Sequence, residues 1–160
     1  MSRNAARDTE WLDRAVAAAT ANVADGGGPF AALIVHDGAV VATGENRVTR
    51  DLDPTAHAEV VAIREACRAL GTFALQGATL YSSCEPCPLC LAAALWARVD
   101  AVVYAADRDD AARAGFDDRA FYELLGRDRR TWPTDVVERR VDACTAPFEA
   151  WLAFDGRTPY

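Results

Sequence analysis

The chain has 160 residues, 51% of them hydrophobic, and a formal net charge of -7. This length suits one domain with a substantial core, so we expect a single domain over residues 1–160. The acidic excess argues against a broad nucleic-acid surface, which needs clustered Lys and Arg to neutralise phosphates. No apolar run approaches the roughly 20 residues of a membrane-spanning helix, so we expect a soluble protein without a membrane partner.

The N-terminal third predicts one helix followed by a β-hairpin. Apolar residues recur at helical spacing over residues 11–23, and the glycine-rich break at 26–29 ends this helix. Two apolar runs, 30–35 and 40–43, flank a turn at 36–38 whose glycine can adopt a positive φ. The two runs are therefore expected to pair as neighbouring strands.

The middle of the chain predicts a helix and then a β-α-β unit. A loop over 46–54 precedes a helix whose apolar face extends from residue 60 to 70. Residues 78–82 and 101–105 are expected to be buried strands, with a helix over 88–97 between them. This pattern is typical of parallel strands.

The C-terminal part predicts a helix over 118–125, a last strand over 136–141 and a helix over 147–154. Together the elements indicate an α/β fold. We expect a three-layer α/β/α sandwich around a mixed five-stranded sheet, because a buried sheet needs helices on both faces.

The strongest chemical signal is a histidine followed by a cysteine pair. His57 stands two residues before Glu59, and Cys87 and Cys90 form a Pro-Cys-x-x-Cys motif. One imidazole and two thiolates give three zinc ligands, and a catalytic zinc keeps a fourth position for water. His-x-Glu with Pro-Cys-x-x-Cys is the signature of zinc-dependent deaminases.

A role for Glu59 follows from this chemistry. Zinc lowers the pKa of a bound water to about 7, and a nearby carboxylate must then move protons. Glu59 is close to His57 in sequence, so it can pass a proton from water to a ring nitrogen and to departing ammonia. A helix starting at Cys87 would also direct backbone amides at the sulfurs and favour thiolates.

Two other interpretations of the motif stay open. A closed structural zinc site needs four protein ligands, and Cys84 could supply the fourth, because it also forms a Cys-x-x-Cys pair with Cys87. Spacing alone does not choose between the pairs, although a closed site would leave Glu59 without a role. Iron or cobalt could also occupy these ligands. Five cysteines, three of them crowded together, favour a metal and a reducing cytoplasm over a disulfide framework.

Beyond the metal motif, the chain resembles the cytidine-deaminase superfamily over nearly its whole length, and within it the bacterial guanine deaminases. The Ala-Gly-Phe-Asp-Asp stretch and the aromatic tail point to the guanine branch. The segments that carry the resemblance are 27–30, 44–46, 54–59, 81–90, 96–98, 114–118 and 147–160.

The resemblance implies a cytidine-deaminase-like fold and roles for the residues of the metal motif. His57, Cys87 and Cys90 would hold one Zn²⁺ per subunit, and Glu59 would be the catalytic proton shuttle. The implied substrate is a small-molecule nucleobase or nucleoside.

The resemblance also assigns a substrate pocket. Asn46 and the backbone amide of Ala58 would hydrogen-bond the ring, while Phe30 and Trp96 would line the pocket. Asp118 would contact the purine and assist proton movement as a second catalytic residue.

A homodimer is implied as well. In the resembling family the C-terminal segment, here about 143–160, crosses to the partner subunit. Its last tyrosine, here Tyr160, would close the partner's site.

Without the resemblance, ordinary structural explanations compete for these residues. Asn46 could be a turn residue after the second strand. Asp117 or Asp118 could cap a helix. Phe30 and Trp96 stand at apolar positions that more often pack in a core.

Departures from the pattern of the guanine branch leave the identity of the substrate base open. Ala31 replaces a frequent glycine, and the small residues 92–94 follow the zinc motif where bulkier ones are common. Guanine hydrolysis to xanthine and ammonia is the expected reaction, by a hydrolase acting on a cyclic amidine. Guanosine, an aminotriazine such as ammeline, and cytosine or cytidine are alternatives, and adenosine in transfer RNA is disfavoured by charge. Outside enzymes, the alternative is a non-catalytic, zinc-stabilised interaction module.

Overall fold

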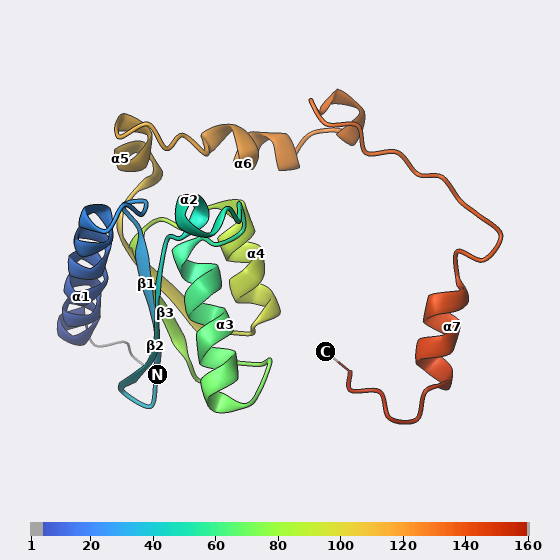
Figure 1. The fold of residues 1–160 in the computed structure, drawn as a ribbon, viewed down its shortest axis with the longest axis horizontal. Helices are drawn as coiled ribbons and strands as arrows, with labels where there is room; N and C mark the ends of the chain where they lie inside the picture. Colours follow the sequence, from blue (N-terminus) through green and yellow to red (C-terminus); the bar gives the residue numbers. More distant parts are fainter. Residues whose placement is uncertain (1–4, 160) are drawn as a thin grey trace. The chain divides into compact units, whose positions relative to one another are not determined.

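The computed structural model describes residues 5–159, and the chain divides into two units, Met1–Tyr122 and Glu123–Tyr160 (Figure 1). The first unit contains the whole sheet and begins with a long helix, as the sequence predicts. Its elements are α1 (Ala5–Ala24), β1 (Ala31–His36), β2 (Ala39–Glu45), α2 (Val48–Asp51), α3 (Ala58–Leu70), β3 (Thr79–Cys84), α4 (Pro88–Trp96), β4 (Ala101–Ala106) and α5 (Arg108–Arg113). Helix α6 (Arg119–Leu125) spans the boundary between the units.

The sheet is mixed and has four strands in the order β2-β1-β3-β4. β1 pairs antiparallel with both β2 and β3, whereas β3 pairs parallel with β4. The hairpin turn places Asp37 and Gly38 at positive φ, 51° and 74°, which is the geometry of a tight two-residue turn. The predicted hairpin and the predicted β-α-β unit are both confirmed.

Helices cover both faces of the sheet, which gives the three layers (Figure 1). Along β1 the side chains alternate between the faces. Leu33 and Val35 pack with Trp11 of α1, while Ala32 and Ile34 belong to the cluster that includes α3 and α4. The cluster that includes α3 and α4 is rich in alanine, so these two helices approach the sheet closely.

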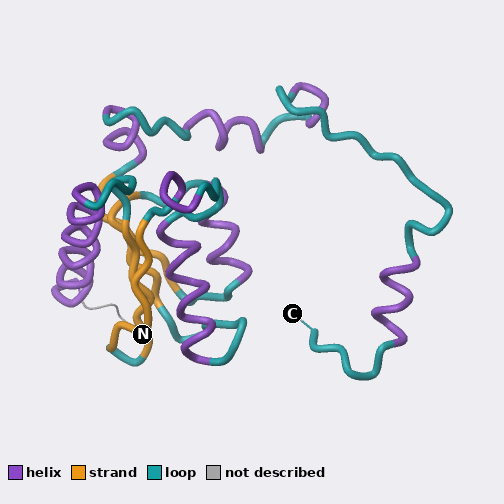
Figure 2. Tube along the Cα trace, viewed as in Figure 1, coloured by secondary structure: helices purple, strands orange, loops and turns teal. Residues whose placement is uncertain are grey.

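The predicted fifth strand over 136–141 is wrong for this structure. These residues form a loop (Figure 2), and Val136, Val137 and Val141 are exposed. An apolar segment becomes a strand only where another strand offers its backbone hydrogen-bonding groups. In the described chain, no strand pairs with this segment. The sheet therefore has four strands where the sequence predicts five.

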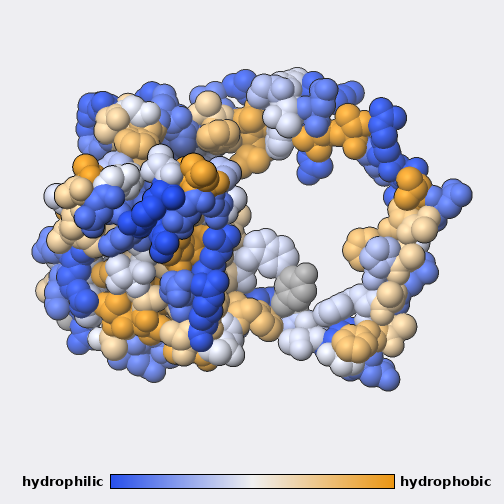
Figure 3. Space-filling view, in the orientation of Figure 1, coloured by the Kyte–Doolittle hydropathy of each residue, from blue (hydrophilic) through white to orange (hydrophobic). Residues whose placement is uncertain are grey.

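The second unit contains helix α7 (Ala146–Ala153), close to the helix predicted over 147–154. None of its described residues is buried, and hydrophobic residues are interspersed with hydrophilic ones along its surface (Figure 3). Among the described helices, none has the length and hydrophobicity needed to cross a membrane.

Candidate active site

Two helix starts bring together the three residues of the metal motif. His57 is the N-cap of α3, Cys87 is the N-cap of α4, and Cys90 lies in the first turn of α4. The His57 Nδ1 atom lies 3.5 Å from Cys87 Sγ and 3.4 Å from Cys90 Sγ, and the two sulfurs are 3.5 Å apart. These three atoms form the metal-ligand group that the described residues offer.

The geometry of this group fits zinc. A tetrahedral zinc with sulfurs at about 2.3 Å and nitrogen at about 2.0 Å separates its sulfurs by about 3.8 Å, and sulfur from nitrogen by about 3.5 Å. The observed separations are close to these values. Two thiolates and one imidazole are also a donor set that suits zinc chemically.

The electrostatics of the group favour a thiolate at Cys87. Contact with the Cys90 sulfur lowers the pKa of Cys87 to about 4, and the neighbouring His57 and the Cys90 backbone amide act in the same direction. The contact with the Cys87 sulfur in turn raises the pKa of His57. The backbone amide at this helix start therefore favours the Cys87 thiolate, as the sequence suggests, whereas the pKa of the Cys90 thiol is raised.

Glu59 lies beside the metal group and is buried, with 6% of its surface exposed. Its Oε2 atom accepts a hydrogen bond from Cys90 Sγ at 3.2 Å, and its Oε1 atom accepts one from Ser82 Oγ at 3.1 Å. Burial raises the pKa of this carboxyl group. The side chain is thus held in one orientation next to the metal position.

Cys84, the alternative ligand, is not a member of the metal-ligand group. Its thiol donates to the backbone carbonyl of Asp107 at 3.6 Å, and burial raises its pKa to about 11. The contact with Asp107 places the Cys84 sulfur outside the group formed by the three ligand atoms.

A cavity of about 790 Å³ opens next to the metal group, and all the residues that line it belong to the first unit. Phe30 and Phe116 meet edge to face in its wall, with ring centroids 5.0 Å apart. Predicted site residues that line the cavity are Phe30, Asn46, His57, Glu59, Cys87 and Asp118. Asn46 also accepts a hydrogen bond from the Val48 amide at 3.3 Å, as a turn residue does.

The two adjacent aspartates before α6 have different surroundings. Asp117 accepts hydrogen bonds from the backbone and side chain of Arg119, the first residue of α6. The Oδ1 atom of Asp118 is buried and has no hydrogen-bond partner among the described residues. Burial raises the pKa of Asp118. The structure therefore leaves Asp118, rather than Asp117, available to a molecule in the cavity.

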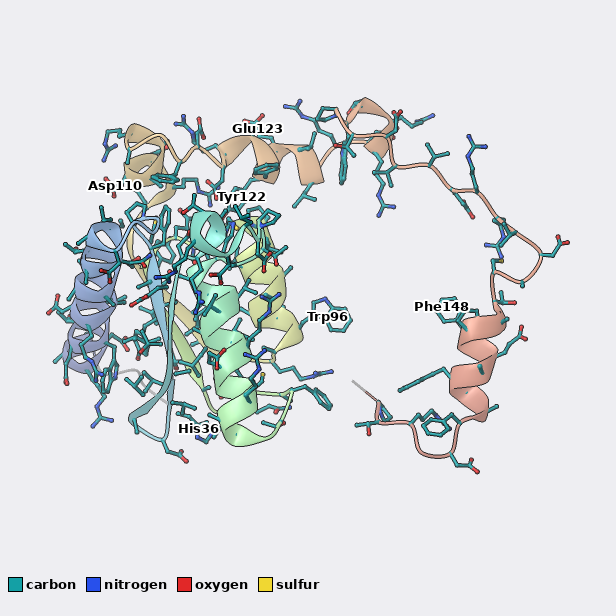
Figure 4. The ribbon with its side chains drawn as sticks, viewed as in Figure 1. His36, Trp96, Asp110, Tyr122, Glu123 and Phe148 are labelled. Carbon is teal, nitrogen blue, oxygen red and sulfur yellow. The ribbon has the colours of Figure 1, made fainter. Side chains whose placement is uncertain are left out.

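Other predicted pocket residues lie elsewhere. Ala58 is fully buried as the first residue of α3, where helix geometry leaves backbone N–H groups without intrahelical partners. Trp96 is 66% exposed at the end of α4 and projects away from that helix, lining a separate hollow with Leu95 and Arg98 (Figure 4). Tyr160 lies outside the described residues.

Sequence reasoning missed three residues at this cavity. Phe116 and Arg108 line it, and Asn22 of α1 holds two of its wall segments together. Arg108 pairs with Glu85 and lies over the ring of Tyr122, 3.8 Å from its centroid. Arg108 and Glu85 are 23 residues apart, and Asn22 and Asn46 are 24 residues apart, so neither contact leaves a local pattern in the sequence.

The fold and the site together are those of a zinc-dependent deaminase. The family model for the cytidine and deoxycytidylate deaminase zinc-binding region matches residues 5–106. The chain belongs to this family.

Within this family, the chain is most extensively similar to guanine deaminases among the following relatives. It is 48% identical over 151 residues to a guanine deaminase of Bacillus subtilis strain 168, covering 94% of this chain and 97% of the relative. The crystal structure of guanine deaminase from Bacillus subtilis superposes with a TM-score of 0.93 at 46% identity and 99% coverage of both chains. A guanine deaminase structure from Nitrosomonas europaea gives a TM-score of 0.65 at 35% identity, covering 68% of this chain and 63% of that one. A tRNA-specific adenosine deaminase of Bacillus subtilis is 39% identical over 62% of each chain.

Proposed function

We propose that this protein hydrolyses guanine to xanthine and ammonia. The observation that carries the proposal is the position of Glu59, buried between the metal-ligand group and the cavity. A purely structural zinc site needs no such carboxylate, and it has no reason to border a cavity. The similarity to guanine deaminases over nearly the whole chain supports the choice of base.

The reaction needs one water and two proton transfers. A zinc ion held by His57, Cys87 and Cys90 would supply a water that is acidic enough to react at neutral pH. Glu59 accepts a proton as the water oxygen attacks the carbon that bears the amino group, and delivers it to the adjacent ring nitrogen. A second proton passes from the added hydroxyl group through Glu59 to the amino group, the C–N bond breaks, and ammonia leaves as the carbonyl forms.

The remaining cavity residues would bind and orient the base. Asn46 is suited to the polar edge of the ring, and Phe30 offers an aromatic face. The N–H of Ala58, which stands between the cavity-lining His57 and Glu59 in the chain, would be a further donor to that edge. Asp118 has a buried carboxylate oxygen without a partner, which suits an N–H or amino group of a purine. Cytosine lacks the second ring that would bring such a donor to this position.

We further propose that the active protein is a homodimer and that the segment of about 143–160 completes the partner's site. The second unit exposes Phe148, Leu152 and Phe154, and α4 of the first unit exposes Leu95 and Trp96. Apolar surfaces of this extent are typical of protein interfaces. A cavity of about 790 Å³ is also larger than one base needs, which leaves room for a further segment to close it. Within such a dimer Tyr160 would have the closing role that the sequence predicts for it, whereas Trp96, which lines a separate hollow, would belong to the interface.

The five cysteines are all free, and two of them must remain reduced to hold the metal. A reducing compartment suits this requirement, so we propose the cytoplasm as its location.

The test is ammonia release by the protein loaded with one equivalent of zinc per chain. Guanine, guanosine, ammeline, cytosine, cytidine and an adenosine-containing anticodon stem-loop RNA form the panel. We expect guanine to have the highest kcat/KM. A preference for cytosine or for the RNA overturns the guanine assignment, and no release from any member favours the non-catalytic zinc module.

A further inference from the structure

We infer that Asn22 is a positioning residue that sets the place of Asn46 in the substrate cavity, an inference that rests on the proposed function. Asn22 lies near the end of α1 and is buried, with 1% of its surface exposed. A polar side chain this buried on a helix is unusual and normally has specific partners.

The partners of Asn22 are backbone groups of two wall segments. Its Nδ2 atom donates to the carbonyl of Gly28 at 2.8 Å and to the carbonyl of Asn46 at 2.9 Å. Gly28 and Asn46 both line the cavity. Gly28 precedes β1 in the sequence, and Asn46 follows β2. One amide group therefore fixes the distance between the segment before β1 and the segment after β2.

Close packing also constrains these residues, which we call the asparagine cluster: Asn22, Gly27, Gly28 and Asn46. A Cβ atom on Gly27 would lie 2.4 Å from Asn22 Nδ2, and one on Gly28 would lie 2.9 Å from Asn46 Oδ1. Such distances are shorter than atoms can adopt without a shift. The two glycines thus allow the segment to pack directly against both asparagine side chains.

The cluster is also kept at a cost to stability. The Oδ1 atom of Asn22 is buried and has no hydrogen-bond partner among the described residues, which is unfavourable by itself. The two donated hydrogen bonds account for the amide at this place, and their acceptors are Gly28 and Asn46 rather than residues of the sheet core.

The Asn22→Asp variant tests the inference, because a carboxylate has the same shape but cannot donate to either carbonyl. We expect KM for the base to rise about tenfold while kcat stays within about threefold, since two hydrogen bonds are lost away from the reacting atoms. Zinc content should remain one per chain. Gly27→Ala, which displaces the Asn22 amide from the other side, should raise KM in the same way.

Ala19→Gly is the matched control. Ala19 is buried on the same helix one turn earlier, and glycine there weakens α1 without removing either hydrogen bond. We expect this variant to lower the melting temperature and leave KM unchanged. An equal rise in KM for Ala19→Gly would mean that any weakening of α1 has this effect, and would overturn the inference.

A double-mutant cycle with Asn46→Ala decides whether Asn22 acts through Asn46. We expect the tenfold effect of Asn22→Asp to fall to about twofold in the Asn46→Ala background, because residues that act together are not additive. Additive effects would contradict the inference. The cycle is measured with whichever base of the panel the parent deaminates. A parent that does not deaminate guanine would therefore contradict the proposed function without deciding the role of Asn22. If Asn22→Asp does not fold, Gly27→Ala completes the cycle.

Discussion

Ser82 and Ser83 are neighbours on β3 with different partners, because successive side chains of a strand point to opposite faces. Ser82 donates to the Glu59 carboxylate, whereas Ser83 accepts a hydrogen bond from the Ala31 amide at 3.1 Å. Ser82→Ala should lower kcat about tenfold with unchanged zinc content, since one hydrogen bond to a charged group is lost. Steady-state kinetics and metal analysis check this expectation.

Ser83→Ala is the control for Ser82→Ala. It removes a buried hydrogen bond from the sheet and should lower the melting temperature without changing kcat. If the two variants lose kcat equally, the orientation of Glu59 does not depend on Ser82.

The ligand assignment is also tested at single residues. Cys90→Ala removes a member of the metal-ligand group, so bound zinc should fall well below one per chain and stability should fall with it. Cys84→Ala should retain a full zinc content, because its thiol contacts the Asp107 carbonyl instead. Metal analysis of the purified variants decides this. Zinc lost from Cys84→Ala but kept in Cys90→Ala would reverse the assignment.

Site residues could be predicted from the sequence where the pattern that marks them lies within a few neighbouring residues. His57, Glu59, Cys87 and Cys90 could be predicted because each pair is close in sequence and lies at a helix start. Asn22 could not, because a lone asparagine on a helix is more often solvated, and its role appears only when distant segments meet it.

At the scale of elements, β2 and α3 are in direct backbone contact at Gly44. A Cβ atom there would lie 2.1 Å from the carbonyl oxygen of Ala58 and 2.3 Å from the amide nitrogen of Ala62. Gly44→Ala should therefore lower the free energy of unfolding by about 1–3 kcal/mol through overpacking. Chemical denaturation measures this value.

Gly126→Ala is the control for Gly44→Ala. A Cβ atom on Gly126 would meet its nearest neighbour, the carbonyl oxygen of Glu123, at 3.6 Å, which is ordinary van der Waals contact. We expect no loss of stability there. If Gly44→Ala is as stable as Gly126→Ala, the close approach of β2 to α3 is not present in solution.

Elements were predictable where apolar spacing and a turn residue agreed. The hairpin and α3 are examples, since Gly38 and Gly71 both adopt positive φ where the sequence places a turn and a helix end. Helix α5 was missed because Arg108–Arg113 contains too few apolar residues for a pattern, although Asp107 and Asp110 form its capping box. The segment 136–141 has the composition of a strand, but its pairing depends on a partner that sequence periodicity does not reveal.

At the scale of the whole molecule, the proposed exchange of C-terminal segments predicts complementation between two defective chains. Glu59→Gln retains the tail but lacks the proton shuttle. A chain truncated before Arg157 retains the shuttle but lacks the proposed closing residues. In a mixed dimer the intact tail would close the intact site, so activity should exceed that of either chain alone by at least about tenfold.

Co-expression of the two chains with different affinity tags, followed by sequential purification, isolates the mixed dimer. Guanine turnover is then compared with that of each chain expressed alone. A mixed dimer no more active than the truncated chain would show that the tail serves its own subunit or does not close the site.

The central claim is that Glu59 moves protons beside a zinc held by three residues in order to deaminate guanine. Guanine turnover by zinc-loaded parent and Glu59→Gln protein, with zinc measured in both, tests it most directly. We predict one zinc per chain in each and a loss of kcat of about 100 to 10,000-fold in the variant, because the amide keeps the shape of the carboxylate but cannot carry protons. Turnover by Glu59→Gln within a few-fold of the parent would contradict the account.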